Sequence, residues 1–203
     1  MTRESKSEKR ITQKVRVVFF ATDNFHKFKE ARKLLKKTVT MGMLRVKGPE
    51  IQSNSLIEIA KNSALETFNR CCLPIVVEDA GLFIDELNGF PGPYAAYTYK
   101  TIGNKGLIQL MKNSKSKKAQ FKSVVAYLDS TTKDPAIFEG EAEGEITNNE
   151  PTECTRSGFG FDPIFSPFGS IKTFAQMSIE EKNNFSHRAK AFSKFAKWYR
   201  NNK

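Results

Sequence analysis

The run Val15-Arg-Val-Val-Phe-Phe-Ala21 is the clearest strand signal in the sequence, because it is apolar, rich in β-branched residues and bounded by turn residues. The segment from Phe25 to Lys37 follows it, with apolar residues at helical spacing at Phe28, Ala31 and Leu34. A strand, a short loop and a helix in this order are typical of the start of an α/β fold.

The rest of the chain continues this alternation of strands and helices. Strands are predicted at Met41–Val46, Ile75–Glu78, Phe121–Leu128 and Ala136–Ile146, and helices at Ser55–Asn69, at Asn104–Met111, after the capping box Ser178-Ile-Glu-Glu181 and over the last residues. The strand that begins at Ile75 is expected to leave the core at Asp79. The carboxyl ends of strands are where α/β proteins usually carry their ligand-binding and catalytic residues. The segment Asn88–Pro93 is expected to form a loop, because it holds two prolines and two glycines.

The strand predicted from Ala136 to Ile146 alternates strictly between two kinds of residue. Phe138, Gly140, Ala142, Gly144 and Ile146 share one face, and Glu139, Glu141, Glu143 and Glu145 share the other. Alternate carboxylates along one strand spread over about 20 Å instead of converging. We therefore expect a solvated face here and no metal site.

Composition narrows the class of protein. The chain has 203 residues, 39% of them hydrophobic, which suits one domain at 15–203 behind a basic N-terminal extension at 1–14. No stretch has the about 20 apolar residues of a membrane span, and the charged start lacks a signal region. The three cysteines form no Cys-x-x-Cys pair, which argues against a disulfide framework and a thiolate zinc site. A cytoplasmic protein fits these observations.

The net charge of +11 indicates an anionic partner without distinguishing nucleic acid, a membrane surface and a small polyphosphate. Thr22-Asp-Asn-Phe-His-Lys27 lies at a predicted helix N-terminus, which suits phosphate, although these residues also serve as ordinary caps. Glu78-Asp79, with Glu50 upstream, offers hard oxygen ligands that suit magnesium.

Two further segments carry residues suited to a nucleotide. Ser157-Gly-Phe-Gly-Phe-Asp-Pro163 combines glycines that permit close backbone approach with two phenylalanines that offer flat faces to a base, or simply fill the core. Ser186-His-Arg188, after Glu181-Lys182, places donors beside a helix N-terminus.

Taken together, the order of these motifs resembles the inosine triphosphate pyrophosphatase family, also called Ham1-like. The motifs are Thr22-x-Asn-x-x-Lys27, Val77-Glu-Asp-Ala-Gly-Leu82, Leu87-Asn-Gly-Phe-Pro-Gly-Pro-Tyr94, Gly158-Phe-Gly-Phe-Asp-Pro-Ile-Phe165, and Phe174-Ala-Gln-Met-Ser-Ile-Glu-Glu-Lys182 with Ser186-His-Arg188. The resemblance spans about Val15 to Phe195.

The resemblance implies an α/β fold with a mixed central sheet, flanking helices and two lobes around a nucleotide cleft, usually in a homodimer. It implies a magnesium-dependent hydrolase that cleaves inosine, deoxyinosine and xanthosine triphosphates to the monophosphate and pyrophosphate. Asp79 and Lys27 would be catalytic, Glu50 and Asp79 would bind Mg²⁺, and His187 and Arg188 would lie near the purine 6-oxo group. The full set implied to bind substrate is Thr22, Asp23, Asn24, Phe25, His26, Lys27, Lys61, Ala80, Phe159, Gly160, Phe161, Asp162, Lys182, His187 and Arg188.

Two residues depart from the family's pattern. The family usually has glycine where this chain has Asp23, and serine or threonine where it has Ala80. We expect the Asp23 carboxylate to cap the first helix instead of facing phosphate, and Ala80 to leave one fewer hydrogen bond for the substrate.

Two other functions remain open at this point. A pyrophosphatase of the Maf type would act on pyrimidine or modified nucleotides, but the Ser186-His-Arg188 motif argues against it. The hypothesis of a basic nucleic-acid-binding protein is supported only by the net charge of +11, because no nucleic-acid-binding motif appears. We therefore expect no stable nucleic-acid partner and no membrane partner.

Overall fold

A computed structural model describes residues 17–46, 51–151 and 158–203 and contains a seven-stranded sheet in the order β2-β1-β3-β5-β6-β7, with β4 paired to β3. The strands are β1 (Val17–Ala21), β2 (Thr40–Leu44), β3 (Ile75–Ile84), β4 (Pro91–Gly92), β5 (Lys118–Leu128), β6 (Ala136–Ile146) and β7 (Phe165–Pro167). β1 pairs in parallel with β2 and β3, whereas β5 pairs antiparallel with β3 and with β6. The expected mixed sheet is confirmed.

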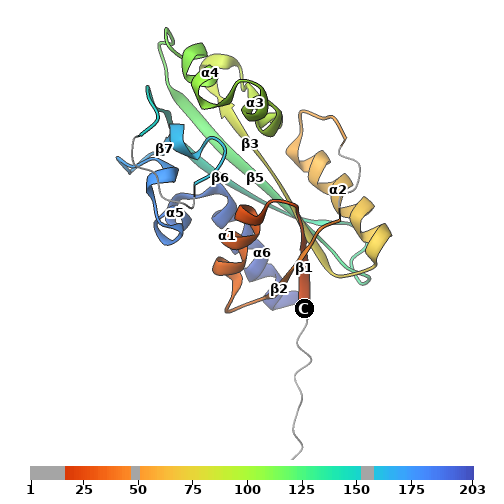
Figure 1. The fold of residues 1–203 in the computed structure, drawn as a ribbon. Helices are drawn as coiled ribbons and strands as arrows, with labels where there is room; N and C mark the ends of the chain where they lie inside the picture. The colour runs from red at the N-terminus through yellow and green to blue at the C-terminus, as the bar shows by residue number, and fades with distance from the viewer. Residues whose placement is uncertain (1–16, 47–50, 152–157) are drawn as a thin grey trace, which may run out of the picture.

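Helices flank this sheet at both ends of its long strands (Figure 1). They are α1 (Phe25–Leu35), α2 (Leu56–Cys71), α3 (Ala95–Thr101), α4 (Gly103–Leu110), α5 (Ile179–Phe185) and α6 (His187–Asn202). In Figure 1, α1, α2 and α6 gather around β1 and β2, whereas α3 and α4 lie at the opposite end of β3 and β5. The long strands therefore connect two lobes.

Separate hydrophobic clusters support the two lobes. In the first lobe α1 and α6 cover one face of the sheet, where Phe192 and Phe195 of α6 pack with Phe20 of β1, while α2 covers the other face with Ala60 and Ala64. The second lobe has its own cluster. Its members include Leu82, Ile84, Leu107, Phe121, Phe165 and Phe174. Because the cores are separate, the junction between the lobes is the place where a cleft can open.

Local signals explain most element boundaries. The Ser55 side chain caps α2 by accepting a hydrogen bond from the Glu58 amide, and Ser178 with Glu181 forms the predicted capping box of α5. On β6 the glutamates are exposed, and the residues from Gly140 to Ile146 that alternate with them are buried. The solvated face predicted for this strand is confirmed.

Three structural expectations were wrong or incomplete. β3 does not end at Asp79 but continues to Ile84, because β5 pairs with it residue by residue over that whole length. The loop at Asn88–Pro93 contains the short strand β4, whose Gly92 pairs with Leu82. Helix α3 was not anticipated.

No helix in the described part of the chain is long and apolar enough to cross a membrane.

Candidate active site

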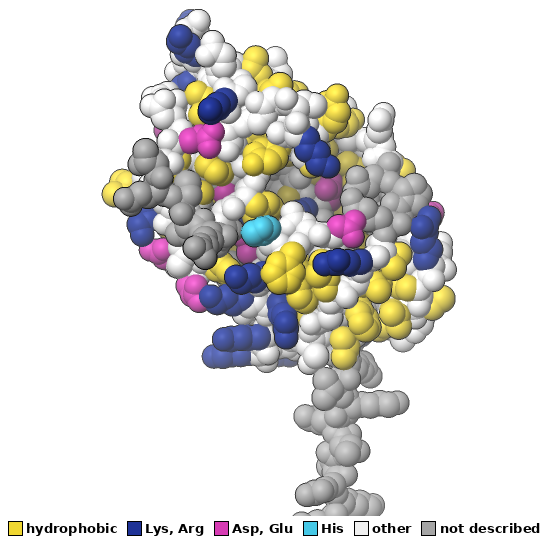
Figure 2. All heavy atoms as spheres, in the orientation of Figure 1, with side chains coloured by type: hydrophobic (Ala, Val, Ile, Leu, Met, Phe, Trp, Pro, Cys, Tyr) yellow, Lys and Arg dark blue, Asp and Glu magenta, His cyan; other side chains and the backbone are white. Residues whose placement is uncertain are grey.

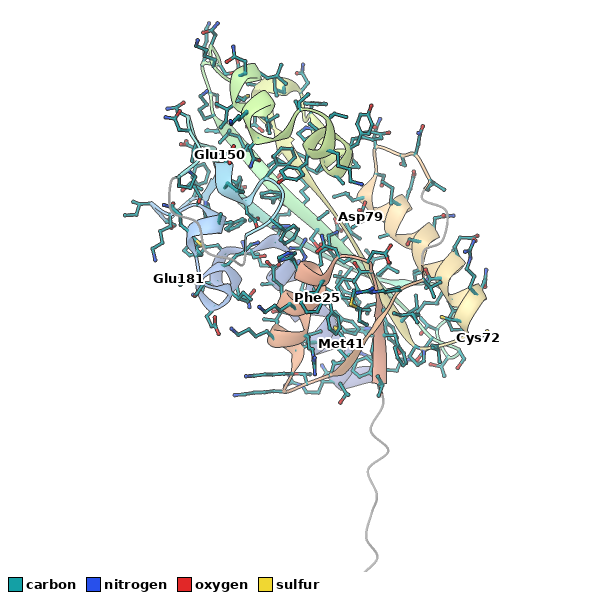
Figure 3. All side chains as sticks on the ribbon, in the orientation of Figure 1. Phe25, Met41, Cys72, Asp79, Glu150 and Glu181 are labelled. Carbon is teal, nitrogen blue, oxygen red and sulfur yellow. The ribbon has the colours of Figure 1, made fainter. Side chains whose placement is uncertain are left out.

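A cavity of about 860 Å³ lies where the two lobes meet. Its walls come from the loop between β1 and α1, from α2, from the middle of β3, from α3, from the segment 158–162 and from the start of α6. Figure 2 shows the hollow in the middle of this face, with a histidine side chain at its edge. In Figure 3, Asp79 lies on β3 between α3 and α1.

Most of the predicted site residues line this one cavity. They are Thr22, Asp23, Asn24, Phe25, His26, Lys27, Asp79, Ala80, Phe159, Gly160, Phe161, Asp162, His187 and Arg188. Lys61 is exposed on α2 and Lys182 is buried beside the cavity, and neither is among the lining residues. Glu50 and the extension at 1–14 lie outside the described residues. The fold thus gathers segments from both ends of the sequence.

The loop between β1 and α1 ends in a helix cap. The Asn24 side-chain oxygen accepts hydrogen bonds from the amides of His26 at 2.9 Å and Lys27 at 3.1 Å, so Asn24 is the N-cap of α1. The expectation that Asp23 caps this helix was wrong, because the chain reaches the cap geometry one residue later. Asp23 is instead an exposed residue of the cavity lining.

A continuous chain of ion pairs crosses the floor of the site. Lys27 Nζ lies 2.8 Å from Glu78 Oε2, and Arg188 Nε lies 3.2 Å from Glu78 Oε1. The Ser123 hydroxyl donates a further hydrogen bond to Glu78 Oε1 at 2.7 Å. Glu78 therefore joins α1 to the start of α6 through β3.

The chain continues beyond Arg188 through Glu30 of α1. Glu30 Oε2 accepts from Arg188 Nη1 at 2.7 Å, and Glu30 Oε1 accepts from Lys182 Nζ at 2.8 Å. Lys182 also pairs with Asp162 at 2.7 Å, and its side chain is only 1% exposed. Six charged side chains, alternately positive and negative, thus connect β3, α1, α5, α6 and the segment that precedes β7.

Attraction to the neighbouring cations keeps Glu78 and Glu30 ionised. Burial opposes the charge on Glu78, but Arg188 and Lys27 outweigh it, so the pKa of Glu78 lies below its usual value. Burial likewise opposes the charge on Glu30, and the neighbouring Arg188 and Lys182 lower its pKa. The same contacts raise the pKa of Arg188 in spite of its burial. All three groups are charged at neutral pH.

His187 differs from its neighbours because it is neutral. Burial, followed by the positive charge of Arg188, lowers the pKa of His187 well below 6.5. Its ring stacks on Phe121 with the centroids 4.7 Å apart, and its Nδ1 has no hydrogen-bond partner within the described residues. A neutral imidazole on the cavity wall can donate one hydrogen bond and accept one.

Aromatic rings line the cavity near the segment 158–162. His26 stacks on Phe159 at 5.4 Å, and Lys182 Nζ and Arg188 Cζ lie 5.0 and 5.4 Å from the centroid of the Phe159 ring. Phe161 meets the edge of Tyr99 from α3 at 5.5 Å. These rings offer flat apolar faces on which a base can stack.

Sequence reasoning missed several residues of the site. Glu30 was passed over, although a carboxylate next to the apolar stripe of α1 is a signal for a buried charge in need of a partner. Tyr99 and Lys100 line the cavity from α3, and no signal pointed to them because the helix itself was not predicted. Ser123 supports Glu78 from the neighbouring strand β5.

The carboxylates of the cavity fit a hard cation. Asp23, Glu78 and Asp79 line one region of loop and strand, but the described residues contain no cluster of three acidic, histidine or cysteine side chains suited to a metal. Magnesium is usually held by one or two carboxylates together with substrate phosphates, so such a cluster is not required. The lining is therefore compatible with a metal that arrives with its ligand.

Comparison with known proteins agrees with this arrangement. The chain is 45% identical over 186 residues to a dITP/XTP pyrophosphatase of Methanopyrus kandleri, covering 91% of this chain and 97% of the relative. The dITP/XTP pyrophosphatase of Thermococcus kodakarensis is also 45% identical, covering 90% of this chain and 97% of the relative.

A solved structure shares the fold. The Ham1 protein from Coxiella burnetii superposes with a TM-score of 0.77 at 25% identity, covering 91% of this chain and 98% of the other. The model of the Ham1 family matches residues 18–198, a span that includes both lobes and every segment lining the cavity. The chain belongs to the Ham1 family.

Proposed function

We propose that this protein hydrolyses non-standard purine nucleoside triphosphates, namely inosine, deoxyinosine and xanthosine triphosphates, to the monophosphate and pyrophosphate. The observation that carries the proposal is the cavity between the lobes, in which a helix N-terminus, Asp79, aromatic rings and the pair His187-Arg188 face one space. Relatives that match nearly the whole chain are named dITP/XTP pyrophosphatases. Removal of such nucleotides from the cellular pool would be the biological role.

The reaction is attack of a water oxygen on the α-phosphorus. A bond forms between that oxygen and phosphorus, and the bond from the α-phosphorus to the bridging oxygen breaks, so that pyrophosphate leaves. Asp79 would orient the water and accept its proton, since its carboxylate lies on the cavity wall formed by β3. Positioning and electrostatic stabilisation supply nearly all of the catalysis in phosphoryl transfer.

The start of α1 would hold the phosphates. The positive end of its dipole lies at the cavity, although Asn24 already accepts hydrogen bonds from the amides of His26 and Lys27, and the Lys27 side chain adds a full charge in the first turn. Lys27 is 19% exposed in its side chain and already pairs with Glu78. Glu78 therefore fixes the ammonium where it can screen charge developing on the leaving pyrophosphate.

Arg188 and His187 would select the base. Arg188 donates a hydrogen bond from Nη1 to Glu30 and forms an ion pair through Nε with Glu78, and the two contacts together hold its guanidinium at the cavity wall. Its remaining N–H groups can donate to a purine 6-oxo oxygen but would oppose the amino group of adenine. His187, held neutral by burial, adds a donor without adding a charge.

The charge of the cavity supports a requirement for magnesium. The described lining holds four carboxylates and three cations, namely Asp23, Glu78, Asp79 and Asp162 against Lys27, Lys100 and Arg188. The carboxylates among these residues would repel a triphosphate, and a bound cation would offset that repulsion. Mg²⁺ held by Asp79 and Glu50 would neutralise phosphate charge and lower the pKa of a bound water.

The test is a turnover panel with direct detection of pyrophosphate. Inosine, deoxyinosine and xanthosine triphosphates should be hydrolysed with kcat/KM far above that for adenosine triphosphate, and chelation of magnesium should stop turnover. Equal rates on all triphosphates, or turnover of pyrimidine nucleotides alone as in a Maf-type enzyme, would refute the proposal. Salt-sensitive binding to nucleic acid without any hydrolysis would instead favour a nucleic-acid-binding protein.

We place the enzyme in the cytoplasm, where the nucleotide pool is found, and we expect a homodimer, as the family resemblance implies. Light scattering coupled to gel filtration measures the second directly, and a mass of one chain, 23.0 kDa, at working concentration would contradict it.

A further inference from the structure

Helix α3 forms the wall of the cavity that faces α1. Ala95, Ala96, Tyr99 and Lys100 all line the cavity, and residues four apart lie on one face of a helix. Tyr97, on another face of the same helix, is 70% exposed. The cavity is therefore lined by two alanines from the first turn of α3 and by Tyr99 and Lys100 from its second turn.

Lys100 differs from the other cations of the lining. Lys27 and Arg188 are both held by carboxylates at distances of 2.7 to 3.2 Å. Lys100 has no ion pair within the residues that the structure describes, and it is exposed. It is thus the one cation of the described lining whose charge is not already compensated by the protein.

We propose that Lys100 binds the phosphate chain of the substrate from across the cleft, opposite Lys27 at the start of α1. The inference rests on the proposed function and adds a residue from the second lobe to it. The phosphate chain carries most of the negative charge of such a substrate. Lys100 can bind it without breaking an existing ion pair, and its flexible stem lets the ammonium follow the ligand. A charge-assisted contact of this kind would also draw the two lobes together.

Direct binding of inorganic tripolyphosphate, measured by calorimetry with and without magnesium, tests this role without any turnover. Lys100→Ala should weaken binding about tenfold, the usual order of one charge-assisted hydrogen bond. Lys100→Arg should keep affinity close to wild type because it retains the charge. Lys105→Ala serves as the matched control, since Lys105 is an exposed lysine of the neighbouring α4 that does not line the cavity.

Kinetics add a second readout. Lys100→Ala should raise KM for inosine triphosphate with little change in kcat, because a contact present in both ground and transition states affects binding alone. The affinity of the Lys100→Ala variant for tripolyphosphate should also depend less on salt concentration than the affinity of the wild type. Unchanged melting curves would show that the variants are folded.

The outcomes separate this inference from the function on which it rests. If the wild type hydrolyses inosine triphosphate while Lys100→Ala binds tripolyphosphate as well as Lys105→Ala does, the role of Lys100 is refuted and the function stands. If the wild type binds tripolyphosphate through Lys100 but hydrolyses no purine triphosphate, the proposed function fails and the phosphate contact stands. Absence of tripolyphosphate binding by the wild type would overturn the inference.

Discussion

Replacement of Glu30 by glutamine should destabilise the protein more than almost any other single substitution of a charged residue. Glu30 is 4% exposed and accepts from Arg188 at 2.7 Å and from Lys182 at 2.8 Å. The chain of ion pairs holds three positive and three negative charges and is neutral overall, its members being Lys27, Glu78, Arg188, Glu30, Lys182 and Asp162. Glu30→Gln leaves a sum of +1 in the interior.

Removing one partner from a buried ion pair costs about 3–5 kcal/mol, because the remaining charge has lost water without keeping its counterion. We expect a loss in this range from Glu30→Gln, which is a large part of the about 5–15 kcal/mol by which most domains are stable. Urea unfolding followed by circular dichroism measures it. Glu143→Gln, which removes an exposed glutamate of β6, should change stability by less than about 0.5 kcal/mol.

A double variant distinguishes charge imbalance from loss of packing. If uncompensated charge causes the loss, Glu30→Gln combined with Lys182→Met should be less destabilised than the sum of the two single variants by at least about 1 kcal/mol. A Glu30→Gln protein as stable as Glu143→Gln, or strict additivity in the double variant, would refute the ion-chain argument.

Three other predictions follow from the site. Asp79→Asn should leave the fold intact and abolish most turnover, and near wild-type release of pyrophosphate at saturating magnesium would exclude Asp79 as the base. Asn24→Ala should lower the free energy of unfolding by about 1 kcal/mol, whereas Asp23→Gly should change it by only a few tenths, so equal losses in urea would contradict the cap assignment. The lowered pKa of His187 means that the unfolded chain takes up a proton that the folded chain does not, so stability should fall as the pH drops below 6.5. This loss amounts to at most about 1.4 kcal/mol per pH unit, and His187→Gln should remove it, whereas parallel stability curves for the two proteins would show that His187 is not the source.

Most helices and strands could be predicted from the sequence, because the features that define them lie within the segment itself. The strand at Val17–Ala21 and the helices capped by Ser55 and Ser178 need only a run of apolar residues and a capping side chain. Helix α3 was not predicted because its own sequence lacks such features. Its first turn has no side-chain cap, and an exposed tyrosine interrupts any apolar stripe.

The end of β3 was misplaced because its stabilisation is not local. Two consecutive carboxylates normally end an apolar strand, yet Glu78 and Asp79 lie in the middle of a strand of ten residues. Burying Glu78 is possible only because Lys27, 51 positions earlier, and Arg188, 110 positions later, bring their charges to it. No window of the sequence contains these partners together, so the sequence motifs pointed to Lys27, Glu78 and Arg188 separately and did not predict that their side chains contact one another.

The strand with the alternating glutamates, β6, contributes to the site through Gly140. A Cβ atom at Gly140 would lie 2.1 Å from the carbonyl oxygen of His187 and 2.5 Å from the amide nitrogen of Ala191, so the start of α6 packs directly on the backbone of β6. A larger residue at this position would lift the first turn of α6 away from the sheet. Because Arg188 reaches Glu78 and Glu30 from that turn, the absence of a side chain at Gly140 sets the depth at which the guanidinium enters the cavity. The exposed face of β6 carries the row of glutamates that is conspicuous in the sequence. The opposite, buried face carries Gly140 and positions His187 and Arg188, the residues proposed to select the base.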